Sequence, residues 1–204
     1  MSSFAAPQPS HVAAAAALID DYLPTYDVAI TEHLVVDANL EQTYRATRDL
    51  DFLTVRSPLL TASMFVRGLP MRLRGHGVAP PLQLHLTGDH PELPGWLHLG
   101  DVHEREIVFG AIGQFWKADI EWKDVAPEQF AAFCEPGWGK IACHFLLRAD
   151  TPNRTLLTYA CRTATTDPDS RRSMSRYWPW IRPFAGHIMR ATLRTIRAAT
   201  APES

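Results

Sequence analysis

The chain has 204 residues, of which 46% are hydrophobic and 21% charged, values that are ordinary for a globular protein with a full core. Its formal net charge of -2 and its lack of a long basic run give no reason to expect a nucleic acid or a membrane surface as partner. No apolar run is long enough to cross a bilayer, so we expect no stable membrane insertion.

Residues 1–25 are expected to form an N-terminal tail or a short helix. Ser10 can cap a helix that Pro24 would end, and a flexible alanine-rich tail fits these residues equally well. No lysine or arginine precedes the alanine run and two aspartates follow it, which is not the pattern of a secretory signal peptide. Three cysteines, an odd number without metal-ligand spacing, favour a reducing compartment, and we predict a cytoplasmic location.

A strand is predicted over residues 26–36, where β-branched residues are frequent and apolar side chains alternate. The alternation places Glu32 on the same face as the apolar residues. Asn39 then starts a short helix, and a second one is predicted over 57–68. Residues 69–95 are rich in glycine and proline and predict a long loop excursion within the domain, either a binding loop or lid or a segment without fixed structure.

From Trp96 onward, β-like segments follow one another with short connections, which indicates antiparallel pairing. Residues 127–133 are expected to form a short helical or irregular connection between two of them. Five further strands are predicted, over 96–102, 105–116, 120–125, 139–148 and 154–166.

The segment 168–199 predicts one long helix. Asp167 is a suitable N-cap, and Pro168 occupies the first helical position, where a missing N–H does no harm. Pro179 and Pro183 each remove an intrahelical donor and therefore predict a kink. The apolar residues that recur at helical spacing are Met174, Tyr177, Trp178, Ile181, Phe184, Ala185, Ile188, Met189, Thr192 and Ile196.

The order of these elements predicts an α+β fold. A strongly curved antiparallel sheet of about six strands would grip the long C-terminal helix, with two short helices after the first strand. We expect a single domain over 26–199 and a disordered tail over 200–204. A curved sheet around a long helix leaves a space between the two.

A resemblance to a known family is carried by five phrases, YDVAITEHLVVDA, REIVFGAIGQFW, EPGWGKIACHFLLR, TLLTYACRTATTDPDSRR and RPFAGHIMRATLRTIR. They resemble the SRPBCC superfamily, the START-like and birch-pollen-allergen-like helix-grip proteins that include polyketide cyclases, aromatases and lipid carriers. The resemblance covers about residues 26–199 and implies a hydrophobic cavity between sheet and helix for a lipid-like or polycyclic ligand. The family has no universal catalytic motif, so the resemblance assigns no catalytic residue.

A ligand site of this kind is mostly apolar with a few polar anchors, and the chain has six tryptophans that can supply apolar walls. Any single tryptophan can instead belong to the packed core. The predicted ligand-pocket residues are Trp116, Trp122, His144, Arg162, Tyr177, Trp178, Ile181 and Ile188.

Four ionisable residues, Glu32, Glu121, His144 and Arg162, lie within β-like segments, where an inward-facing charge needs a partner. If a hairpin closes at residues 150–153, His144 and Arg162 lie at about the same level on neighbouring strands. There either residue could hold a ligand carbonyl or carboxylate. Each can instead be solvent-facing or structurally paired, and the strand register decides between these outcomes.

No cofactor is predicted, because the nine histidines form no HExxH pattern or His/Cys cluster and no G-x-S-x-G element is present. A metal site is likewise not expected. Cys143 and Cys161 can be cross-strand neighbours, and we expect them to stay reduced because a disulfide between paired strands is strained.

Three functions remain open at this point. The first is binding of a hydrophobic small molecule, such as a lipid, a polyketide or an aromatic, in an internal cavity. The second is a polyketide cyclase or aromatase-like enzyme that uses polar cavity residues, and shifted pKa values at inward-facing residues would favour it. The third is a non-catalytic regulatory or interaction protein, which would have a filled core and an exposed apolar patch.

Overall fold

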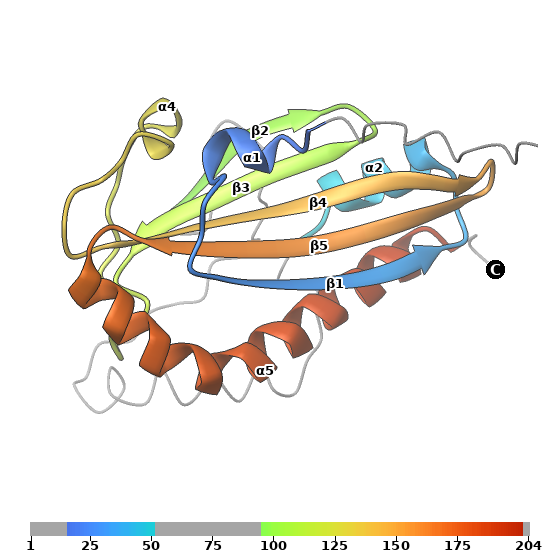
Figure 1. Cartoon of the computed structure of the whole chain (residues 1–204). Helices are drawn as coiled ribbons and strands as arrows, with labels where there is room; N and C mark the ends of the chain where they lie inside the picture. Colours follow the sequence, from blue (N-terminus) through green and yellow to red (C-terminus); the bar gives the residue numbers. More distant parts are fainter. Residues whose placement is uncertain (1–15, 52–94, 202–204) are drawn as a thin grey trace, which may run out of the picture.

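The computed structural model describes residues 16–51 and 95–201 (Figure 1). The predicted second short helix over 57–68 and nearly all of the 69–95 excursion lie outside these residues. The described elements are α1 (Ile19–Tyr22), β1 (Val28–Val36), α2 (Leu40–Arg48), β2 (Trp96–Val102), β3 (Glu106–Gly113), α4 (Pro127–Phe130), β4 (Gly139–Thr151), β5 (Arg154–Thr165) and α5 (Pro168–Ala199).

The strands form one sheet of five in the order β1-β5-β4-β3-β2, and every neighbouring pair is antiparallel. The predicted α+β fold, with a long C-terminal helix on an antiparallel sheet, is confirmed. The predicted hairpin β4–β5 is also present. Asn39 caps α2 as predicted, because its side chain accepts the N–H of Gln42. The predicted strand over 120–125 is wrong. This segment makes only one isolated bridge, between Trp122 and Gly113 at the end of β3, and it has no strand to pair with along its length.

The two faces of the sheet are covered by different elements (Figure 1). On one face, which we call the α5 face, residues at alternate positions pack against α5 and α2; on the other, the α1 face, they pack against α1 and the segment around α4. The α5 face carries Ile107, Phe109, Cys143, Phe145, Leu157 and Tyr159. The α1 face carries Leu99, Val108, Ile112 and Ala142.

Helix α5 starts at Asp167, whose side chain accepts the backbone N–H groups of Asp169 and Ser170. It continues for 32 residues with Pro179 and Pro183 inside it. Its axis bends between its two halves, and the convex side of the bend faces away from the sheet (Figure 1). The predicted kink is therefore present. None of the helices in the described ranges is long and apolar enough to span a membrane.

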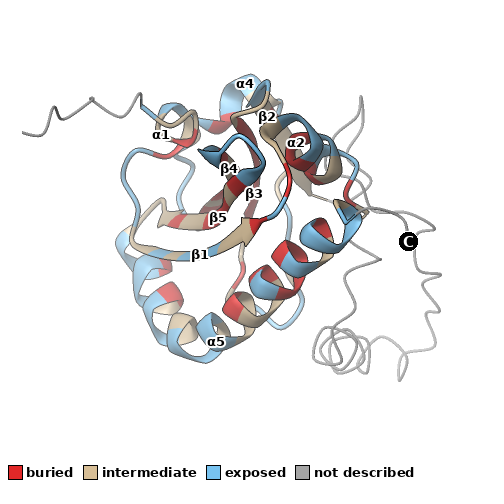
Figure 2. Ribbon diagram, turned by 90° about the vertical axis from the view of Figure 1, so that its right-hand side faces the viewer, coloured by how far each residue is buried: buried red, intermediate tan, exposed pale blue. Residues whose placement is uncertain are grey.

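Figure 2 shows that burial follows this layering, with exposed residues along the outer side of α5 and buried residues in the strands behind it. Close approach of α5 to the sheet edge occurs at Gly186, where an added Cβ would lie 3.1 Å from Glu32 Oε1 and 3.2 Å from Ile30 Cδ1. The helix is thus held against β1 in its second half, C-terminal to both prolines.

Candidate functional site

The register answers the question that the sequence left open for His144 and Arg162. Cys143 lies opposite Cys161, which places Ala142 opposite Arg162 and His144 opposite Ala160. Because the cysteines belong to the α5 face, His144 and Arg162 belong to the α1 face. The two residues do lie near the same level, but on the side of the sheet away from α5. Their predicted role in a pocket beneath α5 is corrected by this placement.

His144 is part of a buried hydrogen-bond group centred on Glu106, the first residue of β3, which has no solvent-exposed surface. His144 Nδ1 lies 2.6 Å from Glu106 Oε1. The backbone N–H groups of Leu18 and Ile19 donate to the two carboxylate oxygens of Glu106 at 2.7 and 3.1 Å. One carboxylate therefore satisfies three donors and fixes the start of α1 on the sheet.

Two opposing effects act on the pKa of Glu106. Burial raises it, while the hydrogen bonds from His144, Leu18 and Ile19 and the charge of His144 lower it. The lowering effects prevail, so the pKa of Glu106 lies below its ordinary value of 4.5 and the carboxylate is ionised at neutral pH. Sequence reasoning missed this residue, although a glutamate at the start of the apolar segment EIVFGAIG was a usable signal.

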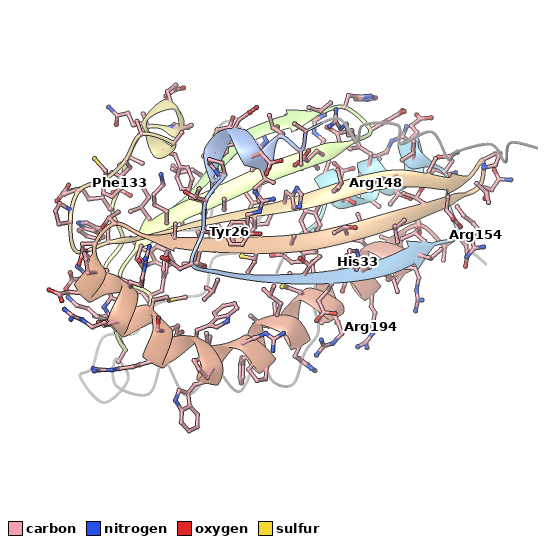
Figure 3. The ribbon with its side chains drawn as sticks, in the orientation of Figure 1. Tyr26, His33, Phe133, Arg148, Arg154 and Arg194 are labelled. Atoms are coloured by element: carbon pink, nitrogen blue, oxygen red, sulfur yellow. A yellow bond between two sulfur atoms is a disulfide. The ribbon has the colours of Figure 1, made fainter. Side chains whose placement is uncertain are left out.

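Arg162 holds the other end of α1. Its Nη1 donates to Asp20 Oδ1 at 2.6 Å and to the Leu23 carbonyl at 3.1 Å. Its guanidinium also lies 5.0 Å from the ring centroid of Tyr26, on the connection between α1 and β1 (Figure 3). The hydrogen bond from Arg162 lowers the pKa of the Asp20 carboxyl below its ordinary value. Glu106 and Arg162 therefore act as two anchors for the short helix.

The two predicted glutamates also have partners. Glu32 faces α5, as the alternation in β1 predicts, and pairs with Arg190 of that helix. Glu121 is exposed and pairs with Lys117 at 2.9 Å in the turn region after β3.

The residues of α5 that were predicted to line a pocket are less buried than the sheet-facing residues near the two ends of the helix. Tyr177, Trp178, Ile181 and Ile188 are all only half-buried. Along the helical stripe that faces the sheet, Met174 near the start and Met189, Thr192 and Ile196 in the second half are buried. No residue between 175 and 185 is fully buried. The middle of α5 is therefore less closely packed than its two ends.

The two tryptophans from the end of the sheet are placed apart from the α5 stripe. Trp116 is half-buried in the turn that follows β3, and Trp122 is 37% exposed. The ring of Trp122 packs edge-on against Phe115, with centroids 6.0 Å apart, and lies over Gly95. Neither tryptophan belongs to the apolar cluster beneath α5 in the part of the chain that the structure describes.

Tyr159 is the residue of the α5 face that the sequence analysis did not single out. It is 7% exposed and packs on Phe145 with ring centroids 4.4 Å apart. Burial raises the pKa of its hydroxyl well above the ordinary value, and this hydroxyl has no hydrogen-bond partner among the described residues. The alternation of Leu157, Tyr159 and Cys161 in β5 was the available signal.

A second polar group lies on the α5 face, on the edge strand β2. His98 of β2 pairs in register with Phe109, and its Nε2 atom is buried without a hydrogen-bond partner. Asp101 Oδ1 is 3.6 Å away, too far for a hydrogen bond, while Asp101 Oδ2 accepts the hydroxyl of Tyr44 at 2.9 Å. The α5 face is thus mostly apolar, and two of its polar atoms, the Tyr159 hydroxyl and the buried His98 Nε2, have no hydrogen-bond partner among the described residues.

Cys143 and Cys161 lie directly opposite each other, with Cα atoms 4.1 Å apart, and form a disulfide. This corrects the expectation of a reduced pair and removes one reason for predicting a reducing compartment. Within residues 16–51 and 95–201, no group of three or more His, Cys, Asp or Glu side chains is placed to hold a metal ion.

A groove of about 420 Å³ lies between β1 and α5 at the bend. It combines apolar and charged groups because the Glu32–Arg190 pair crosses it. The residues that line it are Ala29, Ile30, Thr31, Glu32, Arg182, Pro183, Gly186 and Arg190.

Comparison with known proteins gives structural matches only. No family model matches the sequence, and neither does any curated protein. Norcoclaurine synthase from Thalictrum flavum matches with 8% identity and a TM-score of 0.43 over 100% of both chains. Zhui aromatase/cyclase from Streptomyces sp. R1128 matches with 10% identity and a TM-score of 0.33, over 85% of this chain and 93% of that chain.

 A conserved protein from Geobacillus kaustophilus has 8% identity and a TM-score of 0.41, and its match covers 85% of this chain and 95% of its own. At these identities and TM-scores the matches carry no information about a ligand or a reaction.

Proposed function

We propose that this protein binds a hydrophobic small molecule between the α5 face of the sheet and the middle of α5. The observation that carries the proposal is the burial pattern of the sheet-facing stripe of α5. Met174 and Met189 are buried, whereas Trp178, Ile181 and Ala185 between them are only half-buried. Large apolar side chains that face a sheet without full burial are typical of a ligand site.

The chemistry of the facing strands supports the same proposal. Phe109, Phe145 and Tyr159 form an aromatic group on the α5 face, with ring centroids 4.4 to 6.1 Å apart. The hydroxyl of Tyr159 and Nε2 of His98 are polar atoms without partners in the described part of this face. Because a buried polar atom without a partner is unfavourable, a ligand with a hydroxyl or carbonyl group would gain a hydrogen bond from either.

The enzyme alternative has less support from the same residues. Three of the four ionisable residues that suggested it are paired away from the middle of α5. His144 pairs with Glu106 and Arg162 pairs with Asp20 of α1, both on the other face, and Glu121 pairs with Lys117 in an exposed turn. Glu32 pairs with Arg190 at the sheet edge. We therefore propose binding as the function, with the ligand class limited to apolar molecules that carry few polar groups.

The test is native mass spectrometry of the protein purified from its own host, followed by extraction of the bound molecule. We expect an adduct of lipid or aromatic size on the wild type. Ala185→Trp, which adds a large side chain to the half-buried part of the stripe, should remove the adduct and leave the protein folded. Ser175→Trp, at an exposed position of the same helix, is the matched control and should keep it.

A wild-type protein without an adduct, combined with no thermal shift across a panel of fatty acids, sterols and aromatic polyketides, would contradict the proposal. So would an adduct that Ala185→Trp and Ser175→Trp retain equally, because the ligand would then lie elsewhere. Thermal unfolding of both variants shows whether the fold is preserved.

A further inference from the structure

Charge in this protein is distributed very unevenly. Helix α5 contains seven arginines and one acidic residue, Asp169, although the whole chain has 20 basic and 22 acidic residues. The helix therefore carries a charge of +6 within a chain whose net charge is -2. The arginines lie mainly off the apolar stripe of the helix, and because they are spaced along it they do not form a long basic run in the sequence.

Most of these arginines lie on one side of the helix. Eight residues of α5 follow one another at intervals of three or four positions, which places them on one stripe of the helix. These are positions 172, 176, 180, 183, 187, 190, 194 and 197. We call this the outer stripe. All of its residues are exposed except His187, which is half-buried. Its members are Arg172, Arg176, Trp180, Pro183, His187, Arg190, Arg194 and Arg197.

Trp180 lies at the bend of this stripe and is 84% exposed, far more than any other large apolar side chain in the described residues. It lies between Pro179 and Pro183, both also exposed. A proline ring pushes away the carbonyl four residues earlier, so a helix bends away from the side that carries the proline. The convex side of α5 faces away from the sheet in Figure 1. The exposure of Pro179, Trp180 and Pro183 agrees with their lying on this convex side.

Several arginines of the outer stripe are available to a partner. Arg172 and Arg190 form ion pairs with Asp169 and Glu32. Arg176, Arg194 and Arg197 have no acidic partner among the described residues. Figure 3 shows Arg194 projecting from α5 on the side away from the strands. The stripe thus presents unpaired guanidinium groups on both sides of one exposed indole ring.

We propose that the outer stripe of α5 docks on the surface of an anionic lipid bilayer. The charge of the stripe is complementary to lipid phosphate and carboxylate groups, which guanidinium binds through paired hydrogen bonds. An indole ring prefers the boundary between headgroups and acyl chains, where its apolar body is buried and its N–H stays near water. Arginine side chains are long enough to reach the headgroups while the ring lies deeper.

The convex shape of the helix suits a flat surface. Trp180 at the bend would enter the interface first, while Arg176 on one side and Arg194 with Arg197 on the other reach the headgroup layer. This is peripheral docking on one helix face, and it requires no membrane-spanning segment. It is also independent of the ligand proposed above, because the outer stripe shares no residue with the sheet-facing stripe. Its members Pro183 and Arg190 border the groove beside β1 and not the middle of the α5 face.

The test is co-sedimentation of the full chain with vesicles of phosphatidylcholine alone and of phosphatidylcholine with about 30% phosphatidylserine. We expect binding to the anionic vesicles at about 0.1 M salt and its loss at about 1 M salt. Arg176→Glu combined with Arg194→Glu should weaken this binding by about 100-fold or more, because two positive charges become negative, a net change of about four charge units at the surface. Trp180→Ser should weaken it by about tenfold.

The matched control is Arg45→Glu combined with Arg148→Glu, which makes the same charge change at exposed arginines outside α5. It should leave vesicle binding within about twofold of wild type if the stripe is the docking site. A second readout uses vesicles with brominated acyl chains, which should quench part of the tryptophan fluorescence of the wild type and less of that of Trp180→Phe. All five substituted positions are exposed, and thermal unfolding tests whether the variants are folded.

Three results would overturn the proposal. The first is absence of binding to anionic vesicles at low salt. The second is equal loss of binding in the stripe variant and in the Arg45/Arg148 control, because net charge alone would then explain it. The third is binding of a single-stranded oligonucleotide that the stripe variant loses, without vesicle binding by the wild type, since a nucleic acid would then be the partner.

Discussion

The two faces of the sheet differ in how completely some of their polar groups are hydrogen-bonded. On the α1 face, Glu106, His144 and Arg162 are buried or half-buried, and each is bonded to a partner in the chain. On the α5 face, the hydroxyl of Tyr159 and Nε2 of His98 have no hydrogen-bond partner in the described residues. Polar groups that are satisfied internally hold a structure together, whereas unsatisfied ones are available to a ligand. The difference agrees with a structural role for the polar groups of the α1 face and with the binding role that we propose for the α5 face.

The comparison of the two faces predicts that the largest change in the free energy of unfolding follows substitution of Glu106. Glu106→Ala should lower the free energy of unfolding by about 3–5 kcal/mol, because it leaves His144 and two backbone N–H groups buried without an acceptor. Urea unfolding followed by circular dichroism measures the change. Glu121→Ala, which removes an exposed ion pair, is the control and should change stability by less than about 1 kcal/mol. Similar values for the two variants would contradict the assignment.

A smaller effect is expected at Arg162. Arg162→Met keeps the length of the side chain and removes its hydrogen bonds to Asp20 and the Leu23 carbonyl, which should lower the free energy of unfolding by about 1–3 kcal/mol. A double-mutant cycle with Asp20→Asn should give a coupling energy of about 1 kcal/mol. If the changes in the free energy of unfolding of the two single variants simply add up to that of the double variant, the pair does not anchor α1. Hydrogen exchange of the α1 amides provides an independent readout.

The buried carboxylate of Glu106 also predicts a dependence of stability on pH. The pKa of Glu106 is lowered in the folded state, so its ionised form favours folding. This contribution is complete above the ordinary pKa of 4.5 and is lost as the pH falls through the lower folded value. Urea unfolding between about pH 6 and pH 3 should show stability falling with pH, and Glu106→Gln should show a shallower fall. Parallel curves for the two proteins would exclude Glu106 as a source of the dependence.

The smallest change in the free energy of unfolding is expected for a substitution on the α5 face. Tyr159→Phe should change the free energy of unfolding by less than about 0.5 kcal/mol, because the hydroxyl that it removes has no partner in the described structure. Tyr44→Phe is a matched control, since the Tyr44 hydroxyl donates to Asp101 at 2.9 Å, and it should lower the free energy of unfolding by about 1 kcal/mol. A large loss in Tyr159→Phe would mean that its hydroxyl has a structural role.

Local signals in the sequence were sufficient for most of the secondary structure. Asp167 with Pro168 located the start of α5, Asn39 located the start of α2, and alternation located β1 with Glu32 on its inner face. These features depend on capping and on side-chain periodicity, which are properties of a few neighbouring residues. The segment 120–125 shows the limit of such signals, because a strand also needs a neighbour to pair with.

The sequence alone therefore determined the order of the elements, the α+β class and the bend in the long helix. The tertiary structure decided which face each polar strand residue occupies, since a shift of one residue in register moves every side chain to the other side of a sheet. It placed His144 and Arg162 beneath α1, brought Glu106 to them, and left Tyr159 facing α5. The physical reason is that burial and hydrogen-bond partners arise from segments far apart in the chain, so no local pattern contains them.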